Sequence, residues 1–164
     1  MIELLYKKHN RNDFDCGNEL LNNYLRYQAG QDLKRKLSVC FVLSEPETNI
    51  VQGYYTLSNN SIPVSHFPEH IQKKLPPSYL SIPTTLLGRL AIDKKHQRKG
   101  IGTILLIDAL KRSYETSKVI GSFAVVVDPI DKDAELFYEK YDFIKLPDSK
   151  KMIIGVKTLQ ELFG

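Results

Sequence analysis

Gln97-Arg98-Lys99-Gly100-Ile101-Gly102 is the stretch that decides the fold of this 164-residue chain. An apolar run, 86–92, precedes it, and a run with apolar residues at helical spacing, 100–117, follows it. Its glycines lack Cβ atoms, so backbone can approach a ligand closely. The first N–H groups of a helix have no intrahelical partner and attract anions. Together with its two basic side chains, the stretch predicts a phosphate-binding turn between a strand and a helix.

The glycine pattern narrows the kind of phosphate ligand. The stretch lacks the G-x-x-x-x-G-K-[ST] pattern of nucleotide-binding loops, and the dinucleotide-binding pattern G-x-G-x-x-G fails because position 105 is Leu105. What remains is Q-x-x-G-x-G. A glycine turn that only reverses the chain is the alternative interpretation. The adjacent basic pair and the position at a helix start count against that alternative.

The flanking segments predict one domain built around a sheet, as the length of the chain also suggests. Residues 86–128 predict a strand, a helix and a second strand, so the two strands should be parallel neighbours with a right-handed crossover. The run 122–128 is apolar almost throughout, which is typical of a strand covered on both faces. Five prolines predict an ordered loop over 59–83 with a short helix at 69–74. The other expected elements are strands over 2–6, 38–44, 50–57 and 152–156, a helix after Asp15 that Gly30 interrupts, and helices over 31–36, 133–141 and 158–163. Residues 45–49 are expected to form a hairpin loop between the strands 38–44 and 50–57.

Composition sets the class of protein. Hydrophobic residues make up 42% and charged residues 26%, which is an ordinary globular balance, and the formal net charge is +4. Such a mild basic bias permits an anionic partner without requiring one. Cys40 lies in an apolar run and is expected to be a buried thiol. With no signal-peptide pattern and no apolar run long enough to span a bilayer, we expect a soluble protein of the reducing cytoplasm, without a membrane partner.

The turn and a downstream segment together resemble the GNAT family of acetyltransferases. In that family [R/Q]-x-x-G-x-[G/A] joins a central strand to a helix and grips the pyrophosphate of acetyl-CoA. Gln97, Gly100 and Gly102 match it position by position. The segment 133–143, DAELFYEKYDF, is similar to the family's A-x-x-F-Y-x-x-x-G-F, with Asp142 in place of the usual glycine. That departure is expected to affect only the geometry of the turn.

The resemblance implies the fold, the cofactor and the residues around it. The implied fold class is α/β (α+β), a single GNAT-type domain over 1–164 with a mixed central sheet and helices on both faces. The implied acetyl donor is acetyl-CoA, and no metal is implied. The implied cofactor-binding residues are Leu90, Ala91, Ile92, Gln97, Arg98, Lys99, Gly100, Ile101, Gly102, Thr103 and Phe137.

Further stretches resemble one branch of that family, the GNAT toxins of bacterial toxin–antitoxin pairs, which acetylate the amino acid on charged tRNA. This resemblance implies aminoacyl-tRNA as the substrate, a ribbon-helix-helix antitoxin as a partner, and a homodimer. The stretches are 14–17 (FDCG), 28–32 (QAGQD), 53–57 (GYYTL), 87–93 (LGRLAID), 146–149 (LPDS) and 157–159 (KTL).

Tyr138 is the predicted general acid. The family resemblance places the matching tyrosine beside the sulfur of CoA, and a backbone N–H within 90–92 beside the thioester carbonyl, where it would act as an oxyanion contact. A phenol with a pKa near ~10 stays protonated at neutral pH and can protonate a departing thiolate. On the residues alone, helix packing beside Phe137 and Tyr141 is the stronger interpretation. The family match favours catalysis.

No strong general base is evident among His9, His66, His70 and His96. This favours an α-amino acceptor, because an α-amine has a pKa near ~8 and is partly neutral without help, whereas a lysine amine near ~10.4 is not. The acetylation of charged tRNA by a toxin is therefore the favoured hypothesis. A GNAT enzyme acting on a small amine or a protein N-terminus is the first alternative, and a degenerate fold used only for binding is the second.

Two groups of basic residues are the predicted contacts to tRNA. Lys34, Arg35 and Lys36 form a cluster after the second helix, and Arg89 lies within the central strand. An RNA acceptor stem is polyanionic, so these cations can hold its phosphates. A solvated charge run is an equally good interpretation of the cluster. Arg89 differs, because an arginine inside a central strand usually has a specific partner.

Overall fold

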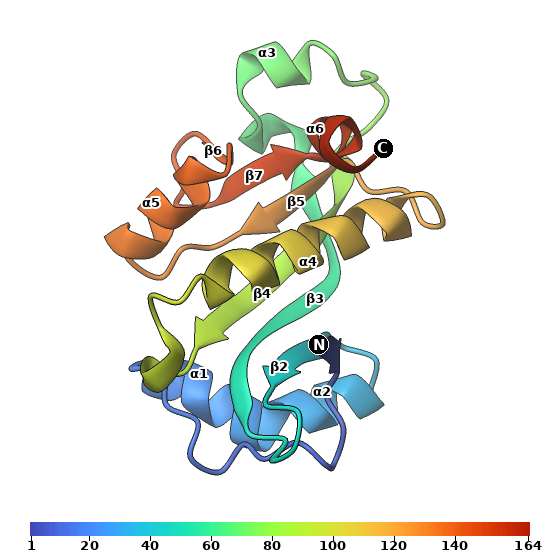
Figure 1. Cartoon of the computed structure of the whole chain (residues 1–164). Coiled ribbons are helices and arrows are strands. Elements are labelled where there is room, and N and C mark those ends of the chain that lie inside the picture. The colour runs from blue at the N-terminus through green and yellow to red at the C-terminus, as the bar shows by residue number, and fades with distance from the viewer. The chain divides into compact units, whose positions relative to one another are not determined.

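The structure is a computed structural model that describes every residue from Met1 to Gly164. Seven strands form a mixed sheet in the order β1-β2-β3-β4-β5-β7-β6 (Figure 1). The chain divides into two compact units, residues 1–58 with 87–109 and residues 59–86 with 110–164. Strands β3 (Val51–Pro63) and β4 (Ser81–Ile92) each run from one unit into the other. The expected mixed sheet is confirmed.

Antiparallel strands and a long helical run build the first unit. β1 (Ile2–Leu4) pairs with β2 (Val39–Ser44), and β2 pairs with β3 through the expected hairpin. The helical run comprises α1 (Glu19–Asn23), a π-helical turn η1 (Tyr24–Gln28) and α2 (Ala29–Lys34). The side chain of Asn18 caps α1 by accepting a hydrogen bond from the Leu21 N–H. The interruption expected at Gly30 is wrong, because this residue lies inside α2 and the irregularity is the π-turn before it.

Side-chain alternation along β3 places helices on both faces of the sheet within this unit. Tyr54, fully buried, packs in the cluster that includes Leu25 and Ala29 of the helical run. Its neighbour Gly53 faces α4 (Ile101–Ser117), where a Cβ would lie only 2.8 Å from Leu105 Cδ1. Successive strand residues point to opposite faces, so the two helical layers cover opposite sides. Cys40, 1% exposed, lies in the same cluster as Tyr54, which confirms the expected buried thiol.

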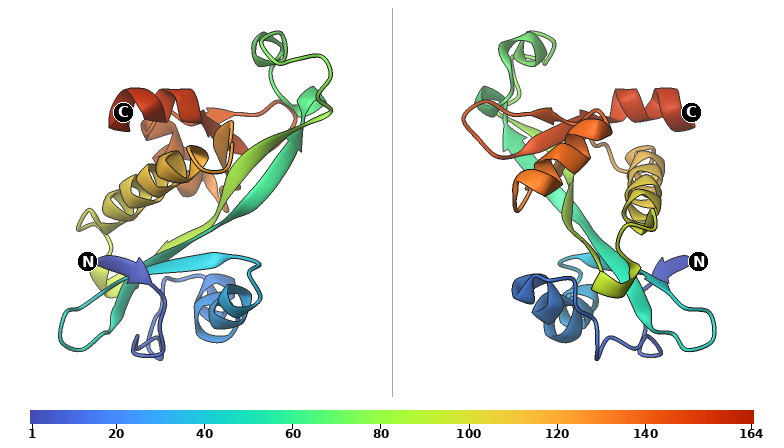
Figure 2. Two further views of the ribbon diagram at one scale, coloured as in Figure 1. Left: turned by 90° about the vertical axis from the view of Figure 1, so that its right-hand side faces the viewer. Right: turned by 60° about the vertical axis from the view of Figure 1, so that its left-hand side comes forward.

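The loop expected over 59–83 is much shorter than predicted. β3 continues to Pro63 and β4 begins at Ser81, leaving only 64–80 outside the strands. Pro83 is tolerated in β4 because it offers only a carbonyl, which accepts a hydrogen bond from the Phe123 N–H at 2.9 Å. The remaining segment carries η2 (Val64–His66) and α3 (Glu69–Gln72), close to the expected short helix, and projects beyond the ends of the two strands (Figure 2).

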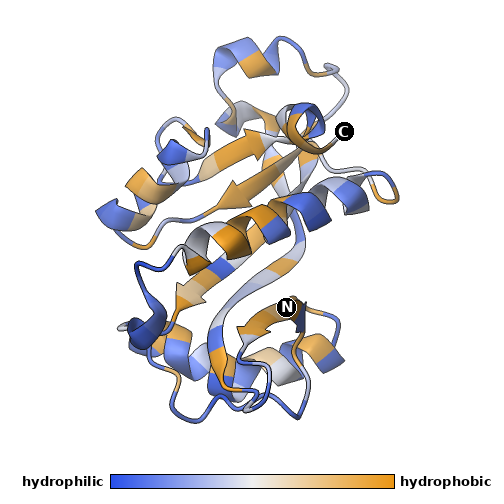
Figure 3. Ribbon diagram, in the orientation of Figure 1, coloured by the Kyte–Doolittle hydropathy of each residue, from blue (hydrophilic) through white to orange (hydrophobic).

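The predicted strand–helix–strand crossover consists of β4 and α4, which both units share, and of β5, which belongs to the second unit. α4 leads into β5 (Ala124–Val127), which pairs parallel to β4 through Thr85 and Val125. All four residues of β5 are buried, as expected for a strand covered on both faces, and β5 and the antiparallel β7 (Met152–Gly155) form the hydrophobic centre of Figure 3. The other elements of this unit are α5 (Lys132–Lys140), a short β6 (Ile144–Lys145) that was not predicted, and α6 (Val156–Phe163).

Candidate functional site

The predicted turn adopts a backbone suited to binding an anion. After η3 (Lys94–His96), Arg98 and Gly100 have φ angles of 63° and 79°, both in the left-handed region. The first regular helical bond of α4 runs from the Ile104 N–H to the Gly100 carbonyl at 3.1 Å. The N–H groups of Gly100, Ile101 and Gly102 precede that bond and have no carbonyl one turn earlier in the helix, and left-handed residues among such groups produce a concave anion site. We call residues 97–103 the cradle.

The glycine at position 100 is required by backbone conformation and not by packing. A Cβ built there would meet no atom within 4 Å. A left-handed φ costs a residue with a side chain roughly 1–2 kcal/mol, which glycine avoids. At the next position Ile101, 9% exposed, anchors the start of α4 in the interior. The cradle therefore combines a fixed helix start with an open space in front of it.

Asp93, which was not predicted as a site residue, holds the cradle in place. The residue is only 7% exposed. One carboxylate oxygen accepts a hydrogen bond from the Asp15 N–H and the other from the Lys95 N–H, each at 3.0 Å. Its own N–H donates to the Gln52 carbonyl at 2.8 Å. The aspartate directly before η3 is the one signal in the sequence, since aspartate favours helix N-caps.

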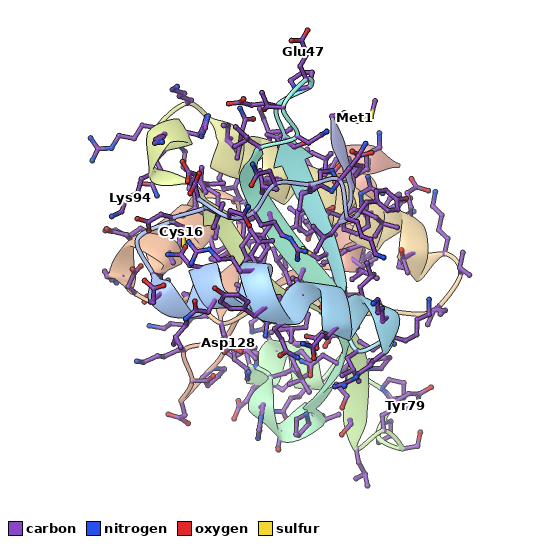
Figure 4. The ribbon with its side chains drawn as sticks, turned by 90° about the horizontal axis from the view of Figure 1, so that it is seen from below. Met1, Cys16, Glu47, Tyr79, Lys94 and Asp128 are labelled. Carbon is purple, nitrogen blue, oxygen red and sulfur yellow. The ribbon has the colours of Figure 1, made fainter.

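Gln97 fastens the cradle to the end of β4 and to the N-terminal loop. Its side-chain amide nitrogen donates to the Ile92 carbonyl at 3.0 Å and to the Cys16 carbonyl at 3.3 Å. Nearby, the Lys94 N–H donates to the Asp15 carbonyl at 2.8 Å. Cys16 and Lys94 accordingly lie near each other in Figure 4, whereas Glu47 marks the distant tip of the β2–β3 hairpin. The amide nitrogen of Gln97 therefore orders the turn.

The two positive charges of the cradle are not paired with other residues of the protein. Arg98 and Lys99 are exposed, and neither forms an ion pair or a side-chain hydrogen bond with the protein. Lys94, by contrast, pairs with Asp15 at 3.6 Å. Two uncommitted cations beside a helix N-terminus produce a positive potential in front of the open N–H groups. The arrangement suits a pyrophosphate.

The strand before the cradle is packed tightly against its neighbours. Ala91 is 5% exposed within the core cluster of the first unit. Its carbonyl would lie 3.1 Å from a Cβ at position 53, so Gly53 permits the close approach of β3, β4 and α4. Leu90 and Ile92 are half-buried. This packing fixes the strand end, as a backbone contact to a reacting carbonyl requires.

Arg89 has the specific partner that its position suggested. Its guanidinium carbon lies 3.4 Å from the centroid of the Tyr24 ring, and one of its nitrogens donates to Thr56 Oγ1 at 3.5 Å. The Tyr24 hydroxyl donates to the buried Asp32 carboxylate at 2.7 Å. Burial, followed by that hydrogen bond, raises the pKa of Tyr24 to about 12. Tyr24 and Asp32 were not predicted as site residues.

The predicted basic cluster is exposed at the end of α2. Lys34 is the last residue of α2, Arg35 follows it as the C-cap, and Lys36 has a φ of 62°. None of the three forms an ion pair. They belong to the same unit as the cradle and Arg89, so the first unit holds all the predicted cationic residues.

Phe137 and Tyr138 lie on α5 in the second unit. Asp131 caps this helix by accepting a hydrogen bond from the Ala134 N–H at 2.8 Å. The Tyr138 ring packs against Phe137 and Phe143, with centroids 5.3 and 5.1 Å away. Tyr138 is 8% exposed, and its hydroxyl has no hydrogen-bond partner. Burial raises the pKa of this phenol, so it stays protonated at neutral pH.

The departure from the family pattern at Asp142 has a local explanation. The φ of Asp142 is 69°, in the left-handed region just after α5, which explains why the family pattern has a glycine at this position. Aspartate is among the few residues that tolerate this conformation. The Phe143 N–H still donates to the Tyr138 carbonyl at 3.2 Å. The turn after α5 is therefore formed with an aspartate at its left-handed position.

No helix of the chain combines the length and the apolar character needed to cross a membrane. No group of three or more histidine, cysteine, aspartate and glutamate side chains is arranged to hold a metal ion. His96 lies beside carboxylates instead, with its Nδ1 3.4 Å from Asp93 and its Nε2 3.7 Å from Glu45.

Known proteins are similar to this chain both in sequence and in fold. Residues 38–145 match the acetyltransferase (GNAT) domain. A protein of Mycobacterium tuberculosis called a tRNA-acetylating toxin is 32% identical over 152 residues, covering 92% of this chain and 89% of the relative. The structure of AtaT complexed with acetyl-methionyl-tRNAfMet superimposes with a TM-score of 0.92 at 29% identity, over 100% of this chain and 99% of the other.

A further solved structure similar to this chain contains a related toxin with bound ligands. It contains an AtaT toxin with a tyrosine-to-phenylalanine substitution, bound to the C-terminus of the antitoxin AtaR and to acetyl-CoA. It matches with a TM-score of 0.83 at 26% identity, over 99% of this chain and 97% of the other. The domain match spans more than half of the chain. The chain belongs to the GNAT family of acetyltransferases.

Proposed function

We propose that this N-acetyltransferase acetylates the α-amino group of aminoacyl-tRNA with acetyl-CoA, and that it thereby acts as a toxin that blocks translation. The observation that carries the proposal is the pairing of the cradle with relatives that act on charged tRNA. The proposal treats residues 1–164 as one acetyltransferase domain.

The residues of the cradle fit acetyl-CoA. A pyrophosphate needs several N–H donors and positive charge, and residues 98–103 offer a left-handed backbone, a helix start and two uncommitted cations. Arg98, Lys99 and the amides of Gly100, Ile101, Gly102 and Thr103 would hold the phosphates. Gln97 would act on the ligand through the turn that it orders.

The chemistry requires the amine to attack the thioester carbonyl and the CoA thiolate to leave. A backbone N–H of Leu90, Ala91 or Ile92 would donate to the carbonyl oxygen as negative charge develops on it. Tyr138 would give its phenolic proton to the thiolate, since its hydroxyl has no competing partner, and the proton released by the acetylated nitrogen would restore the phenol through water. Phe137 would pack beside the cofactor. An α-amine needs no strong base, because a usable fraction is neutral near its pKa of ~8.

The acceptor RNA would be held by the basic residues of the first unit. Lys34, Arg35 and Lys36 present uncompensated charge at the end of α2, and Arg89 presents a guanidinium beside the strand end. Phosphate contacts of this kind position a nucleic acid without reading its sequence. Charge reversal in Arg35→Glu should weaken tRNA binding and leave acetyl-CoA affinity unchanged.

The decisive experiment incubates the purified protein with radiolabelled acetyl-CoA and total charged tRNA. We expect label in the tRNA fraction that is released, on mild alkaline hydrolysis, as N-acetylated amino acid. Deacylated tRNA serves as the control and should take up no label. Label found only on added polyamines or peptides would favour the alternative small-amine or N-terminal acetyltransferase, and label nowhere would exclude both.

We infer a homodimer, a cytoplasmic location, and inhibition by a ribbon-helix-helix antitoxin; an AtaT relative bound to the C-terminus of its antitoxin supports the last of these. Sedimentation of the purified protein tests the dimer. Co-expression with any small ribbon-helix-helix protein found encoded next to its gene would test the antitoxin, because a true antitoxin restores growth and forms a stable complex.

A further inference from the structure

A polar network crosses the interface between the helical run and β4 in the first unit. Tyr24, Gln28 and Asp32 are spaced four residues apart and so share one side of the run. One oxygen of the Asp32 carboxylate accepts from the Tyr24 hydroxyl at 2.7 Å, and the other accepts from the Gln28 amide at 2.8 Å. The π-turn lies within this stretch, and π-turns are frequent at functional sites.

Arg89 completes the network without being neutralised by it. The guanidinium lies on the face of the Tyr24 ring at 3.4 Å, and a single hydrogen bond, to Thr56, occupies one of its nitrogens. No carboxylate lies within ion-pair distance. A guanidinium carries five N–H donors, so most of the fork is uncommitted although the residue is half-buried.

The position of the Tyr24 phenol explains why the charge is left free. A buried carboxylate beside an arginine normally forms a two-point pair that uses up the guanidinium fork. Here Tyr24 and Gln28 each donate a hydrogen bond to one oxygen of Asp32. The Tyr24 ring therefore lies between Asp32, which binds its hydroxyl, and Arg89, which packs on its face. Keeping an unpaired cation half-buried is unfavourable unless a ligand supplies the anion.

We propose that the Arg89 guanidinium binds a phosphodiester of the acceptor RNA, and that Tyr24 and Asp32 are positioning residues that hold it without pairing with it. This inference rests on the proposed function, because Arg89 directly precedes Leu90–Ile92, the segment assigned to the thioester carbonyl. A guanidinium fork matches the geometry of phosphate oxygens. Bound there, the phosphate would place the 3′ end of the RNA beside the reacting group.

The experiment measures binding of uncharged tRNA by filter retention as a function of salt. The slope of log affinity against log salt counts phosphate contacts, at about 0.7–0.9 for each one. Arg89→Gln should lower the slope by about that amount, whereas Arg89→Lys should keep the slope and bind about 3–10-fold more weakly, because it retains charge without the fork. Tyr27→Phe is the matched control, since its exposed hydroxyl on the same helical run has no partner.

The positioning role of Tyr24 and Asp32 predicts how the salt dependence of tRNA binding changes in two further variants. Tyr24→Phe keeps the ring but releases Asp32, which can then pair with Arg89 and cancel its charge, so the slope should fall as it does in Arg89→Gln. Adding Asp32→Asn removes the carboxylate and should restore the wild-type slope. A packing role for Tyr24 would give no such rescue. Unchanged melting temperature and acetyl-CoA affinity show that each variant is folded.

Two results overturn the inference: equal slopes for the wild type and Arg89→Gln, or a double variant that keeps the slope of Tyr24→Phe. A wild type that binds no tRNA overturns it as well. Failure of the proposed function is distinguishable. A protein that binds tRNA with an Arg89-dependent slope but labels no charged tRNA would retain this phosphate site and lose the proposed reaction.

Discussion

Tyr24 in the first unit and Tyr138 in the second expose the same small fraction of their surface, 8%, yet their hydroxyl groups differ completely. The Tyr24 hydroxyl donates to Asp32 at 2.7 Å and its ring supports Arg89. The Tyr138 hydroxyl has no partner and its ring lies among other aromatic side chains. A phenol that is mostly buried and makes no hydrogen bond within the protein keeps its proton available to a ligand.

The difference between the two regions indicates a division of labour. The first unit uses side-chain hydrogen bonds to shape backbone: Asp93 and Gln97 order the cradle. The second unit surrounds one phenol with apolar rings and offers it no acceptor. A hydroxyl that must transfer its proton is a weaker donor if it is already hydrogen-bonded to a permanent partner. A side chain that positions other groups, in contrast, needs such a hydrogen bond. We therefore assign positioning to the first region and proton transfer to the second.

Replacing Tyr138 should have the largest effect. Tyr138→Phe removes only the unpaired oxygen, so the fold should persist while kcat falls about 10²–10⁴-fold, the usual contribution of a general acid. The KM for acetyl-CoA should stay near the wild-type value, because the cradle is untouched. Steady-state acetylation of charged tRNA measures both constants.

The control for that experiment is Tyr79→Phe, which removes an exposed hydroxyl from the segment 64–80 of the same unit. It should leave kcat unchanged. If the Tyr138→Phe enzyme keeps the turnover of the wild type, Tyr138 serves only in packing. It would then not differ from Tyr24 by a role in proton transfer.

The sequence predicted the regular part of the fold well, because it has strong local signals. The parallel crossover through α4, the hairpin after β2 and the buried β5 follow from apolar periodicity and turn residues. The extension of β3 and β4 was missed, because prolines at 63 and 83 are poor strand residues whose missing N–H is harmless only at suitable positions. Gly30 was overrated as a helix breaker, because tertiary packing outweighs propensity.

Alkaline pH should lower the stability of the fold through both Tyr24 and Tyr138. Each has a raised pKa in the folded protein, so above pH ~10 the unfolded state loses its proton first and stability falls as pH rises. One such group contributes a slope of at most about 1.4 kcal/mol per pH unit. For Tyr24 the fall should end near its folded pKa of about 12.

Urea unfolding between pH 9 and 12 tests this expectation. Tyr24→Phe and Tyr138→Phe should each make the free energy of unfolding less steeply dependent on pH than in the wild type. Tyr27→Phe, which alters an exposed residue, provides the baseline. A Tyr138→Phe variant with the wild-type slope would show that its phenol is as hydrated as an exposed one.

Gly100→Ala should have a smaller effect that tests the cradle of the first unit. A Cβ there meets no atom within 4 Å, so any cost comes from the φ of 79° alone, about 1–2 kcal/mol of stability. If the backbone relaxes to avoid that cost, the N–H groups turn away and the KM for acetyl-CoA rises by about 10-fold. Thermal unfolding and steady-state kinetics measure the two outcomes. Gly121→Ala is the matched control, because it also meets no atom and needs no left-handed backbone.

The candidate site was only partly predictable, and the reason is physical. Local patterns reveal a glycine turn or an F-Y pair on a helix, so the cradle and Tyr138 were found. Asp93, Tyr24 and Asp32 act through partners that the fold supplies from other parts of the chain, such as the Asp15 N–H and the Arg89 guanidinium. Apart from the helix-cap position of Asp93, the sequence around these residues does not indicate which distant groups they contact.

Asp142→Gly should give the smallest effect, and it should be stabilising. Asp142 has a φ of 69° just after α5, a conformation that costs aspartate more than glycine. Glycine also gains freedom in the unfolded chain, which offsets part of the benefit, so the net gain is about 0.5 kcal/mol by urea unfolding. Turnover should not change, since the turn carries Tyr138 but does not contact its hydroxyl. Lower turnover in this variant would mean that the aspartate turn itself places the phenol, and the second unit would then share the positioning role assigned here to the first.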